Sequence, residues 1–410
     1  MDRRKPRPEN GILILLGVLS VLVCLALGSL VVACELRNAG VSHVQILAPP
    51  NGTIIARGET LAVHVASAGR GLVRSELVVD GEVVDSVSSP RVGGLTDWSI
   101  THSWQAEQLG QHRVSARVFD LAGGATESAS LVVAVPPPGG IAFSSNRTGA
   151  YQIYTMQTDG LGLAAVTTGP EQKREASCRA EGLLLCTATT DVGASDIWLL
   201  ELETGERLAL TSGLGGDRWS RWAPDATAVA FISDRYGPSQ LFIMNPDGSG
   251  QVQVTREEFP TMQPSWAPDG SAVLVAADRE GNWDIFSVDV DGGSFTRLTS
   301  DPGDDLEPAW SPDGDEIAFT SNRDGNQQIY IMKADGSAPQ RITAFPLGAE
   351  QPRWSPDGEW IVCVAYTGRG ERLGAREIYL MRRDGSDQMR LTDNAFDDTE
   401  PDWCEQNERR

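Results

Sequence analysis

Six polar or aromatic side chains occupy the same place in a repeated sequence unit, three residues before its most regular position. These residues are Glu175, Trp219, Gln263, Glu307, Gln351 and Glu400. If the repeated segment forms the innermost strand of a closed ring of sheets, the six side chains surround one mouth of a central channel. Carboxylates, amides and an indole placed there could bind a cation, a basic peptide or the arm of a partner protein. The alternative is that they cap strand ends and face solvent.

The placement of histidine limits the catalytic chemistry. The sequence has four histidines, and every one precedes residue 136: His43, His64, His102 and His112. A Ser-His-Asp or Cys-His site, or a histidine-bound metal, built from residues 140–404 is therefore excluded. The G-x-S-x-G motif of α/β hydrolases is absent from the sequence. We expect His102 and His112 to form a surface pair on neighbouring strands.

Carboxylates are the remaining groups that could do chemistry. Paired acids could cleave a glycosidic bond, but no pair stands out in the sequence. The segment Asp289-Val290-Asp291-Gly292-Gly293 lacks the spaced ligands and terminal glutamate of an EF-hand, so we expect a turn there. We therefore expect no catalytic residue, no metal and no cofactor.

The elements that would position the six side chains come from an internal repeat. Copies of W-[SA]-P-D start, 44 residues apart, at Trp222, Trp266, Trp310 and Trp354. A degenerate copy lies 44 residues earlier, at Cys178, and a last tryptophan lies 49 residues later, at Trp403. The longer last step indicates an insertion around residues 367–375. A period of this length is typical of solenoids and propellers.

Each unit predicts four short strands joined by tight turns. After the tryptophan segment of one unit come apolar runs at residues 317–321 and 328–332, then Asp335-Gly336, then a short run at 341–343. Asp-Gly pairs suit tight hairpins because glycine tolerates positive φ without steric cost. Four antiparallel strands in one unit make one propeller blade.

The two ends of the repeat region complement one another. Residues 140–143 read as the second strand of a unit that lacks its tryptophan strand, and residues 400–403 read as a tryptophan strand that lacks its second strand. We therefore predict that the last segment completes the first blade, which closes a six-bladed ring and removes open sheet edges. Arginines repeated after Asn or Asp, at Arg147, Arg235, Arg279 and Arg323, predict an ion pair or hydrogen bond that recurs between turns.

The region before the repeats predicts a second β domain and an anchor. Residues 44–135 alternate apolar and polar side chains in about seven runs, which predicts a β-sandwich, and residues 136–140 form a proline-rich linker. Residues 1–35 combine a basic flank with an uncharged apolar run, which is long enough for a membrane-spanning helix. Val31-Val32-Ala33-Cys34 also resembles a lipobox, so lipidation at Cys34 is the other possibility.

Charge and cysteine content narrow the class of partner. The formal net charge of −22 argues against nucleic acid, which requires clustered Lys and Arg. The six cysteines match no zinc pattern of paired CxxC type. Cys178 and Cys186 could bridge neighbouring strands in an oxidising compartment, or both could be buried free thiols.

The motifs of residues 140–404 resemble those of a known family. The patterns W-[SA]-P-D-G, [IV]-A-F-x-[ST]-[ND]-R and I-Y-x-M-x-x-D-G-S look like the repeats of TolB, a periplasmic propeller of the bacterial cell envelope. Gly110 to Val135 resembles the end of bacterial Ig-like domains. The resemblance implies an all-β fold, a six-bladed β-propeller preceded by an Ig-like β-sandwich. The apolar run of residues 1–35 adds an N-terminal anchor helix to this expectation.

The resulting functional expectation is a binding protein rather than an enzyme. We expect a monomer tethered to the membrane and facing the extracellular or periplasmic side. Its propeller face or channel mouth would bind a protein, peptide or glycan. The alternative is a carboxylate-dependent hydrolase or lyase acting on carbohydrate.

Overall fold

The computed structural model describes residues 43–404 apart from 180–181, 190–192, 214, 292–293 and 370–371. Every regular element in these residues is a β-strand, and the chain divides into two compact units at Val135 and Pro136. No helix long and apolar enough to cross a membrane occurs among the residues described. The expected anchor in residues 1–35 and the lipidation candidate Cys34 lie outside them.

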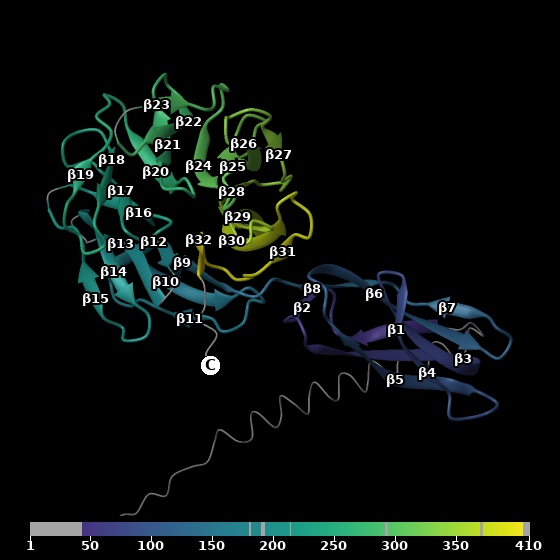
Figure 1. Cartoon of the computed structure of the whole chain (residues 1–410). Coiled ribbons are helices and arrows are strands. Elements are labelled where there is room, and N and C mark those ends of the chain that lie inside the picture. The colour runs from purple at the N-terminus through teal and green to yellow at the C-terminus, as the bar shows by residue number, and fades with distance from the viewer. Residues whose placement is uncertain are drawn as a thin grey trace, which may run out of the picture. The chain divides into compact units, whose positions relative to one another are not determined.

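The second unit consists of six four-stranded antiparallel sheets, which we number as blades along the chain (Figure 1). From the inside outward, blade 1 contains β32 (Asp398–Cys404), β9 (Gly140–Thr148), β10 (Ala150–Gln157) and β11 (Ala164–Ala165). Blade 2 contains β12 (Gln172–Arg179), β13 (Leu183–Thr189), β14 (Ser195–Glu201) and β15 (Arg207–Ala209). Blade 3 contains β16 (Asp217–Trp222), β17 (Val229–Ser233), β18 (Gln240–Met244) and β19 (Val252–Gln253).

The remaining blades follow the same order. Blade 4 contains β20 (Thr261–Trp266), β21 (Ala272–Asp278), β22 (Trp283–Asp289) and β23 (Phe295–Arg297). Blade 5 contains β24 (Asp305–Trp310), β25 (Glu316–Ser321), β26 (Gln328–Lys333) and β27 (Gln340–Arg341). Blade 6 contains β28 (Ala349–Trp354), β29 (Trp360–Arg369), β30 (Arg372–Arg382) and β31 (Met389–Arg390).

The ring closes as the sequence predicts. The last strand, β32, pairs with β9 in antiparallel register, with Trp403 opposite Ile141 and Cys404 opposite Gly140. The first strand of each blade lies nearest the ring centre and the fourth lies at the rim (Figure 1). The prediction of six blades and of a final strand that completes the first blade is confirmed.

Packing between blades explains why tryptophan recurs on the inner strand. The indole N–H of Trp354 donates to the Ala309 carbonyl of the preceding blade at 3.1 Å, and the indole of Trp403 donates to the Arg353 carbonyl at 3.1 Å. The second strands are buried on both faces, as in β17, where all five residues are buried. Such strands read as continuous apolar runs rather than alternating ones.

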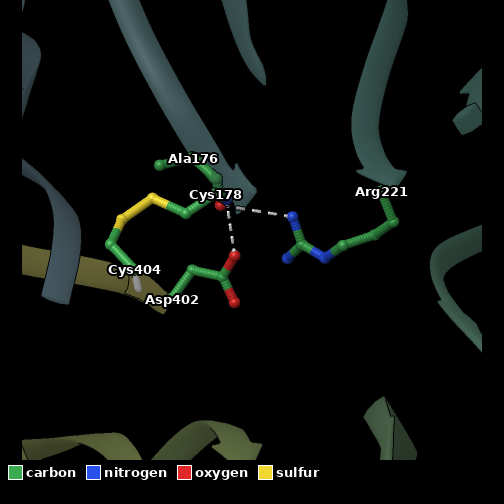
Figure 2. Close-up of a disulfide and its surroundings, with 5 residues drawn as sticks. All are labelled: Ala176, Cys178, Arg221, Asp402 and Cys404. Atoms are coloured by element: carbon green, nitrogen blue, oxygen red, sulfur yellow. Dashed lines mark hydrogen bonds between the residues drawn. A yellow bond between two sulfur atoms is a disulfide. The ribbon is translucent and has the colours of Figure 1, made fainter. Parts of the chain in front are cut away.

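A disulfide fixes the closing strand to the next blade. Cys404 on β32 is bonded to Cys178 on β12, with a Cα–Cα distance of 5.1 Å (Figure 2). Both alternatives weighed from the sequence are therefore wrong for Cys178, while Cys186 and Cys363 are buried free thiols. The reason is register: Cys178 pairs with Leu184, and Cys186 pairs with Trp198 on the other side.

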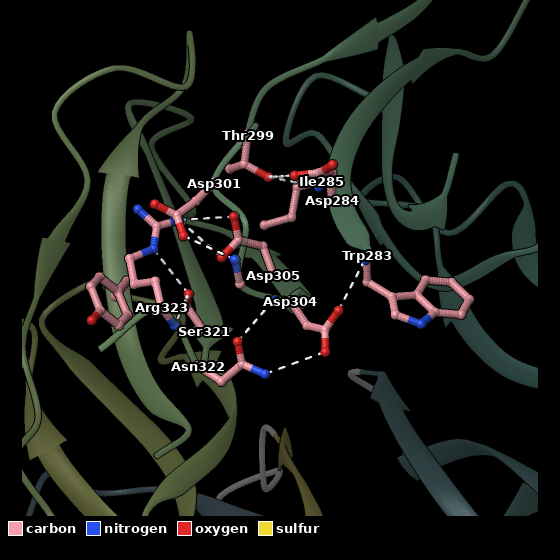
Figure 3. A network of polar contacts seen from close by, with 12 residues as sticks. Trp283, Asp284, Ile285, Thr299, Asp301, Asp304, Asp305, Ser321, Asn322 and Arg323 are labelled. Atoms are coloured by element: carbon pink, nitrogen blue, oxygen red, sulfur yellow. Dashed lines mark hydrogen bonds and ion pairs between the residues drawn. The ribbon is translucent and has the colours of Figure 1, made fainter. Parts of the chain in front are cut away.

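Three of the four repeated arginines make the predicted ion pair. Arg323 contacts Asp305 at 2.8 Å and donates through Nε to Ser321 at 3.0 Å (Figure 3). Arg147 pairs with Asp398 and Arg235 pairs with Asp217 in the same manner. The acid in each case opens the inner strand of the same blade, so the pair joins strands within a blade rather than adjacent turns. In blade 4 that position is a threonine, Thr261, and the buried ion pair is Arg297–Asp284 instead.

The first unit contains eight strands: β1 (His43–Ala48), β2 (Thr53–Ile54), β3 (Thr60–Val79), β4 (Glu82–Ser88), β5 (Leu95–Gln105), β6 (Gly110–Asp120), β7 (Ala125–Glu127) and β8 (Leu131–Val135). The long β3 changes partners near Gly71: its first half pairs with β1 and β5, and its second half with β4 and β6. Apolar side chains from both halves form one core. Assignment of this unit to the Ig-like class stays a prediction.

Candidate functional site

The six predicted site residues occupy one unusual backbone position. Each has a positive φ of 53° to 62° and lies in a bulge where the inner strand slips against the second strand. A non-glycine residue with positive φ is uncommon and carries a cost. Its recurrence in every blade shows that the bulge is part of the fold, and bulges re-aim side chains.

Hydrogen bonds join these positions into a belt around the channel. The side chains of five of the six residues, all except Trp219, accept a bond from the backbone N–H of the equivalent residue in the next blade. Glu175 binds the N–H of Trp219 at 2.7 Å, and Glu307 binds the N–H of Gln351 at 2.7 Å. The remaining bonds are from Glu307 N to Gln263, Glu400 N to Gln351 and Glu175 N to Glu400, at 2.7 to 3.0 Å.

Trp219 interrupts the belt. An indole has an N–H donor and no acceptor, so the backbone N–H of Gln263 lacks the side-chain acceptor that its five equivalents have. Trp219 itself is only partly buried. The N–H of Gln263 is therefore the one belt donor to which the preceding belt residue offers no side-chain acceptor.

The six side chains surround a single small cavity. Its volume is about 40 Å³, and Arg221, Arg353 and Pro401 complete its wall. Space of this size admits a few waters or the tip of one side chain. The structure therefore brings all six predicted residues together at the channel, and their carboxylates and amides act as blade-to-blade acceptors as well as cavity wall.

The two arginines were missed from the sequence. They stand two residues after the belt positions Trp219 and Gln351, where the other blades have Ser177, Ser265, Ala309 and Asp402. The same 44-residue spacing, applied to the position two residues after each belt residue, would have identified both arginines as channel residues. Since these guanidinium groups accompany the three glutamates, the channel carries mixed charge rather than the purely anionic character expected.

Burial perturbs the ionisable groups of the cavity. Removal from water, together with the nearby Glu350, raises the pKa of Glu307 to about 7. Burial and the neighbouring Glu400 also raise the pKa of Glu175. Burial beside a second guanidinium, that of Arg221, lowers the pKa of Arg353 to about 10. Arg353 also has a buried Nε with no hydrogen-bond partner among the described residues.

Acids at or immediately before the start of two inner strands, β24 and β32, have structural partners. Asp305 and Asp398 are fully buried in ion pairs with Arg323 and Arg147. Asp304 accepts bonds from Asn322 and from the N–H of Trp283, and thereby links blade 5 to blade 4 (Figure 3). They are therefore part of the scaffold.

The first unit contains a serine, a histidine and an aspartate in the order of a catalytic triad. Ser75 Oγ lies 2.8 Å from His102 Nε2, and His102 Nδ1 lies 3.0 Å from Asp85. Both Ser75 and His102 are fully buried, so no substrate reaches the hydroxyl, and the arrangement instead ties β3, β4 and β5 together. His112 is buried as well, against Asp80. The predicted surface pair of His102 and His112 is therefore wrong, because carboxylates on neighbouring turns and strands satisfy both rings inside the fold.

Among the residues that the structure describes, no group of three or more His, Cys, Asp or Glu side chains is placed to hold a metal ion. In the Asp289–Asp291 segment, Asp289 accepts a bond from the Asp291 N–H at 3.0 Å, as expected of a turn.

Comparison with known proteins supports the reading of the fold. The family model for the TolB beta propeller domain matches residues 252–373. TolB from Acinetobacter baumannii has a TM-score of 0.57 and 21% identity, covering 72% of this chain and 80% of its own. The putative TolB from Agrobacterium tumefaciens has a TM-score of 0.53 and 25% identity, covering 63% of this chain and 91% of its own.

A curated relative shares a shorter stretch. The uncharacterized peptidase YuxL of Bacillus subtilis (strain 168) is 39% identical over 66 residues, which is 16% of this chain and 10% of the relative. The match thus spans a tenth of that protein's length. Taken together with strand order, ring closure and repeat motifs, these similarities show that residues 136–404 form a TolB-like six-bladed β-propeller.

Proposed function

We propose that this protein is an extracytoplasmic binding or scaffold module whose channel belt receives a segment of a partner. The observation that carries the proposal is the convergence of six equivalent side chains, with Arg221 and Arg353, on one cavity. Convergent polar groups with perturbed pKa values at a concave site are the usual mark of a binding site.

The geometry of the belt defines what the partner would present. Belt position Gln263 offers an N–H without a side-chain acceptor, and Arg353 offers an unpaired Nε. A cavity of about 40 Å³ admits only the tip of a side chain or a peptide carbonyl. We infer a peptide arm of a protein partner that supplies a hydrogen-bond acceptor beside Trp219 and rests on the indole.

The compartment is part of the proposal. The Cys178–Cys404 disulfide favours an oxidising environment, which agrees with a protein exposed outside the cytoplasm. The membrane anchor or lipid at the N-terminus, with the first unit as a spacer, is proposed on the sequence pattern alone. We also propose that the anchored protein is a monomer.

The direct test is substitution of the three belt glutamates. Glu175→Gln, Glu307→Gln and Glu400→Gln together keep an acceptor oxygen at each position but remove the charge. We expect weaker capture of membrane-derived partners by the full chain, and a melting temperature unchanged within a few degrees at pH 5, where the wild-type Glu307 is also uncharged. Exposed Glu203→Gln is the matched control. Unchanged capture by the folded triple variant would contradict the proposal.

A catalytic role is the second candidate, and one observation favours it. Two buried acids, Glu175 and Glu307, have raised pKa values and line the same cavity, as a general acid would. Against it, each carboxylate already accepts bonds from a backbone N–H and a threonine hydroxyl, and the cavity is too small for a sugar ring. Turnover of oligosaccharides by the wild type but not by Glu307→Gln would favour the enzyme instead.

A further inference from the structure

A second concave site lies in blade 3, separate from the channel belt. It has a volume of about 240 Å³ and shares no residue with the belt cavity. Its wall includes the aromatic ring of Tyr236 and the polar side chains Gln253, Arg256 and Glu257, above the buried Phe242. Tyr236 is 76% exposed, so its ring is accessible to another molecule at the pocket.

Comparison among the blades explains why this space is open. The residue equivalent to Gln253 on the fourth strand is arginine in blades 4, 5 and 6: Arg297, Arg341 and Arg390. In blades 4 and 5 this arginine spans the site to a loop acid, Arg297 to Glu280 at 2.9 Å and Arg341 to Asp324 at 3.4 Å. In blade 6, Arg390 pairs with Glu377 and Asp393. In blade 3 the loop acid is replaced by Tyr236, so both halves of the filling ion pair are absent.

The walls of this site are fixed by the framework. The side chain of Gln240 donates to the Glu257 carbonyl at 3.1 Å and accepts from the Glu257 N–H at 3.0 Å. A tight turn with a bond from Gly237 N to Asp234 O presents Tyr236, and its ring lies 6.1 Å from that of Phe242. The site is therefore preformed, which lowers the ordering cost of binding.

The polar groups identify the chemistry of the ligand. Arg256 and Glu257 form no ion pair with other described residues, and Arg256 is exposed. A guanidinium only donates hydrogen bonds and an ionised carboxylate only accepts them, whereas a hydroxyl does both. A neutral polyhydroxyl ligand satisfies both side chains, an anion satisfies only Arg256, and a cation satisfies only Glu257.

We propose that this blade 3 pocket binds one neutral pyranose residue of a glycan. The apolar face of the sugar ring would stack on Tyr236, and adjacent hydroxyls would bond to Arg256, Glu257 and Gln253. A volume of about 240 Å³ is below the roughly 300–1,000 Å³ of pockets for drug-sized ligands, and it suits a single sugar unit rather than an oligosaccharide.

The test uses the full chain and defined ligands. Glucose, galactose and N-acetylglucosamine are titrated by saturation-transfer NMR and calorimetry, with free glycine and acetate as comparison ligands. We expect at least one neutral sugar to bind, and Tyr236→Ala and Arg256→Ala each to weaken it about tenfold or more. Val252 is an exposed residue beside Gln253 on β19. Val252→Ala is the matched control and should bind as the wild type does.

A second variant tests the pocket by filling it. Tyr236→Asp combined with Gln253→Arg recreates the pair found in blade 5, and should abolish sugar binding while the melting temperature is kept. The triple belt variant should still bind sugar, which separates this pocket from the channel proposal. Binding by none of the three sugars, sugar binding that survives Tyr236→Ala, or binding of glycine or acetate alone would overturn the assignment.

Discussion

The carboxylate of Glu175 accepts a hydrogen bond at 2.7 Å from the backbone N–H of Trp219 in the next blade. The two residues are equivalent positions of adjacent repeats, so one bond both joins two blades and aligns their bulges. Four further bonds of the same kind run around the channel. The residues that line the cavity thus also hold the ring together, and only the step from Trp219 to Gln263 is left open.

The belt makes a prediction about stability. Gln351→Leu removes the acceptor for the Glu400 N–H, which lies 2.7 Å away. A buried donor left without a partner costs about 1–3 kcal/mol, so we expect chemical denaturation to show a loss of that size. Gln253→Leu, on an outer strand, is the matched Gln-to-Leu control and should change stability little. Equal effects of the two substitutions would show that the belt bond contributes nothing.

The pH dependence of stability follows from Glu307. Burial raises its pKa from the ordinary 4.5 to about 7 in the folded protein. The folded state therefore keeps a proton that the unfolded chain releases above about pH 4.5. The stabilising contribution is full below that pH and is lost as the pH rises through about 7.

Glu307→Gln should accordingly flatten this part of the pH profile. Relative to the wild type, we expect the variant to gain up to about 3 kcal/mol between pH 5 and pH 8, as an upper bound. Urea denaturation at both pH values measures the difference, with the exposed Glu203→Gln as control. A gain that is the same at both pH values would contradict the raised pKa.

The disulfide predicts a specific peptide map and a stability loss. Digestion without reductant should yield a peptide linking Cys178 to Cys404, with Cys186 and Cys363 as free thiols. The bond links residues 226 apart in sequence, so the Cys178→Ala, Cys404→Ala variant should lose about 2–5 kcal/mol. Reductant should destabilise the wild type and leave this variant unchanged. A Cys178–Cys186 peptide would refute the pairing.

Two ion pairs in blade 5 should differ sharply in their contribution to the free energy of unfolding. The side chains of Arg323 and Asp305 are 13% and 0% exposed, whereas those of Arg341 and Asp324 are 44% and 52% exposed. Arg323→Ala leaves a buried carboxylate unpaired, which costs about 3–5 kcal/mol. Arg341→Ala removes an exposed pair, worth about 1 kcal/mol or less. Thermal denaturation of both variants checks the order, and similar losses would contradict it.

The propeller could be predicted from sequence because the same motif recurs in successive blades. The 44-residue spacing of tryptophan fixes the blade length, and the complementary ends at residues 140–143 and 400–403 fix the closure. The six belt positions followed from the same spacing, since equivalent positions of a closed ring share one radius. Their bulge and their bonds to the next blade did not, because backbone φ leaves no trace in residue type at Glu175 or Gln263.

The two wrong predictions, the state of Cys178 and the surface position of His102, have a common physical cause. The pairing of Cys178 depends on which strand lies beside the closing strand β32, and that neighbour is defined only once the ring is closed. The burial of His102 depends on Asp85, which comes from β4, a strand other than its own. Contacts between residues far apart in sequence decide both cases, and single-strand patterns carry no information about them.

Site-specific photo-crosslinking tests the binding proposal most directly. A photoreactive residue is placed either at Trp219, in the belt, or at Leu208, which is 52% exposed on the outer strand β15. The full chain is then irradiated in native membranes. We predict a discrete crosslinked partner from position 219, abolished by the three Glu→Gln substitutions and absent from position 208. The same products from both positions, or products from position 208 alone, would contradict a binding site in the channel.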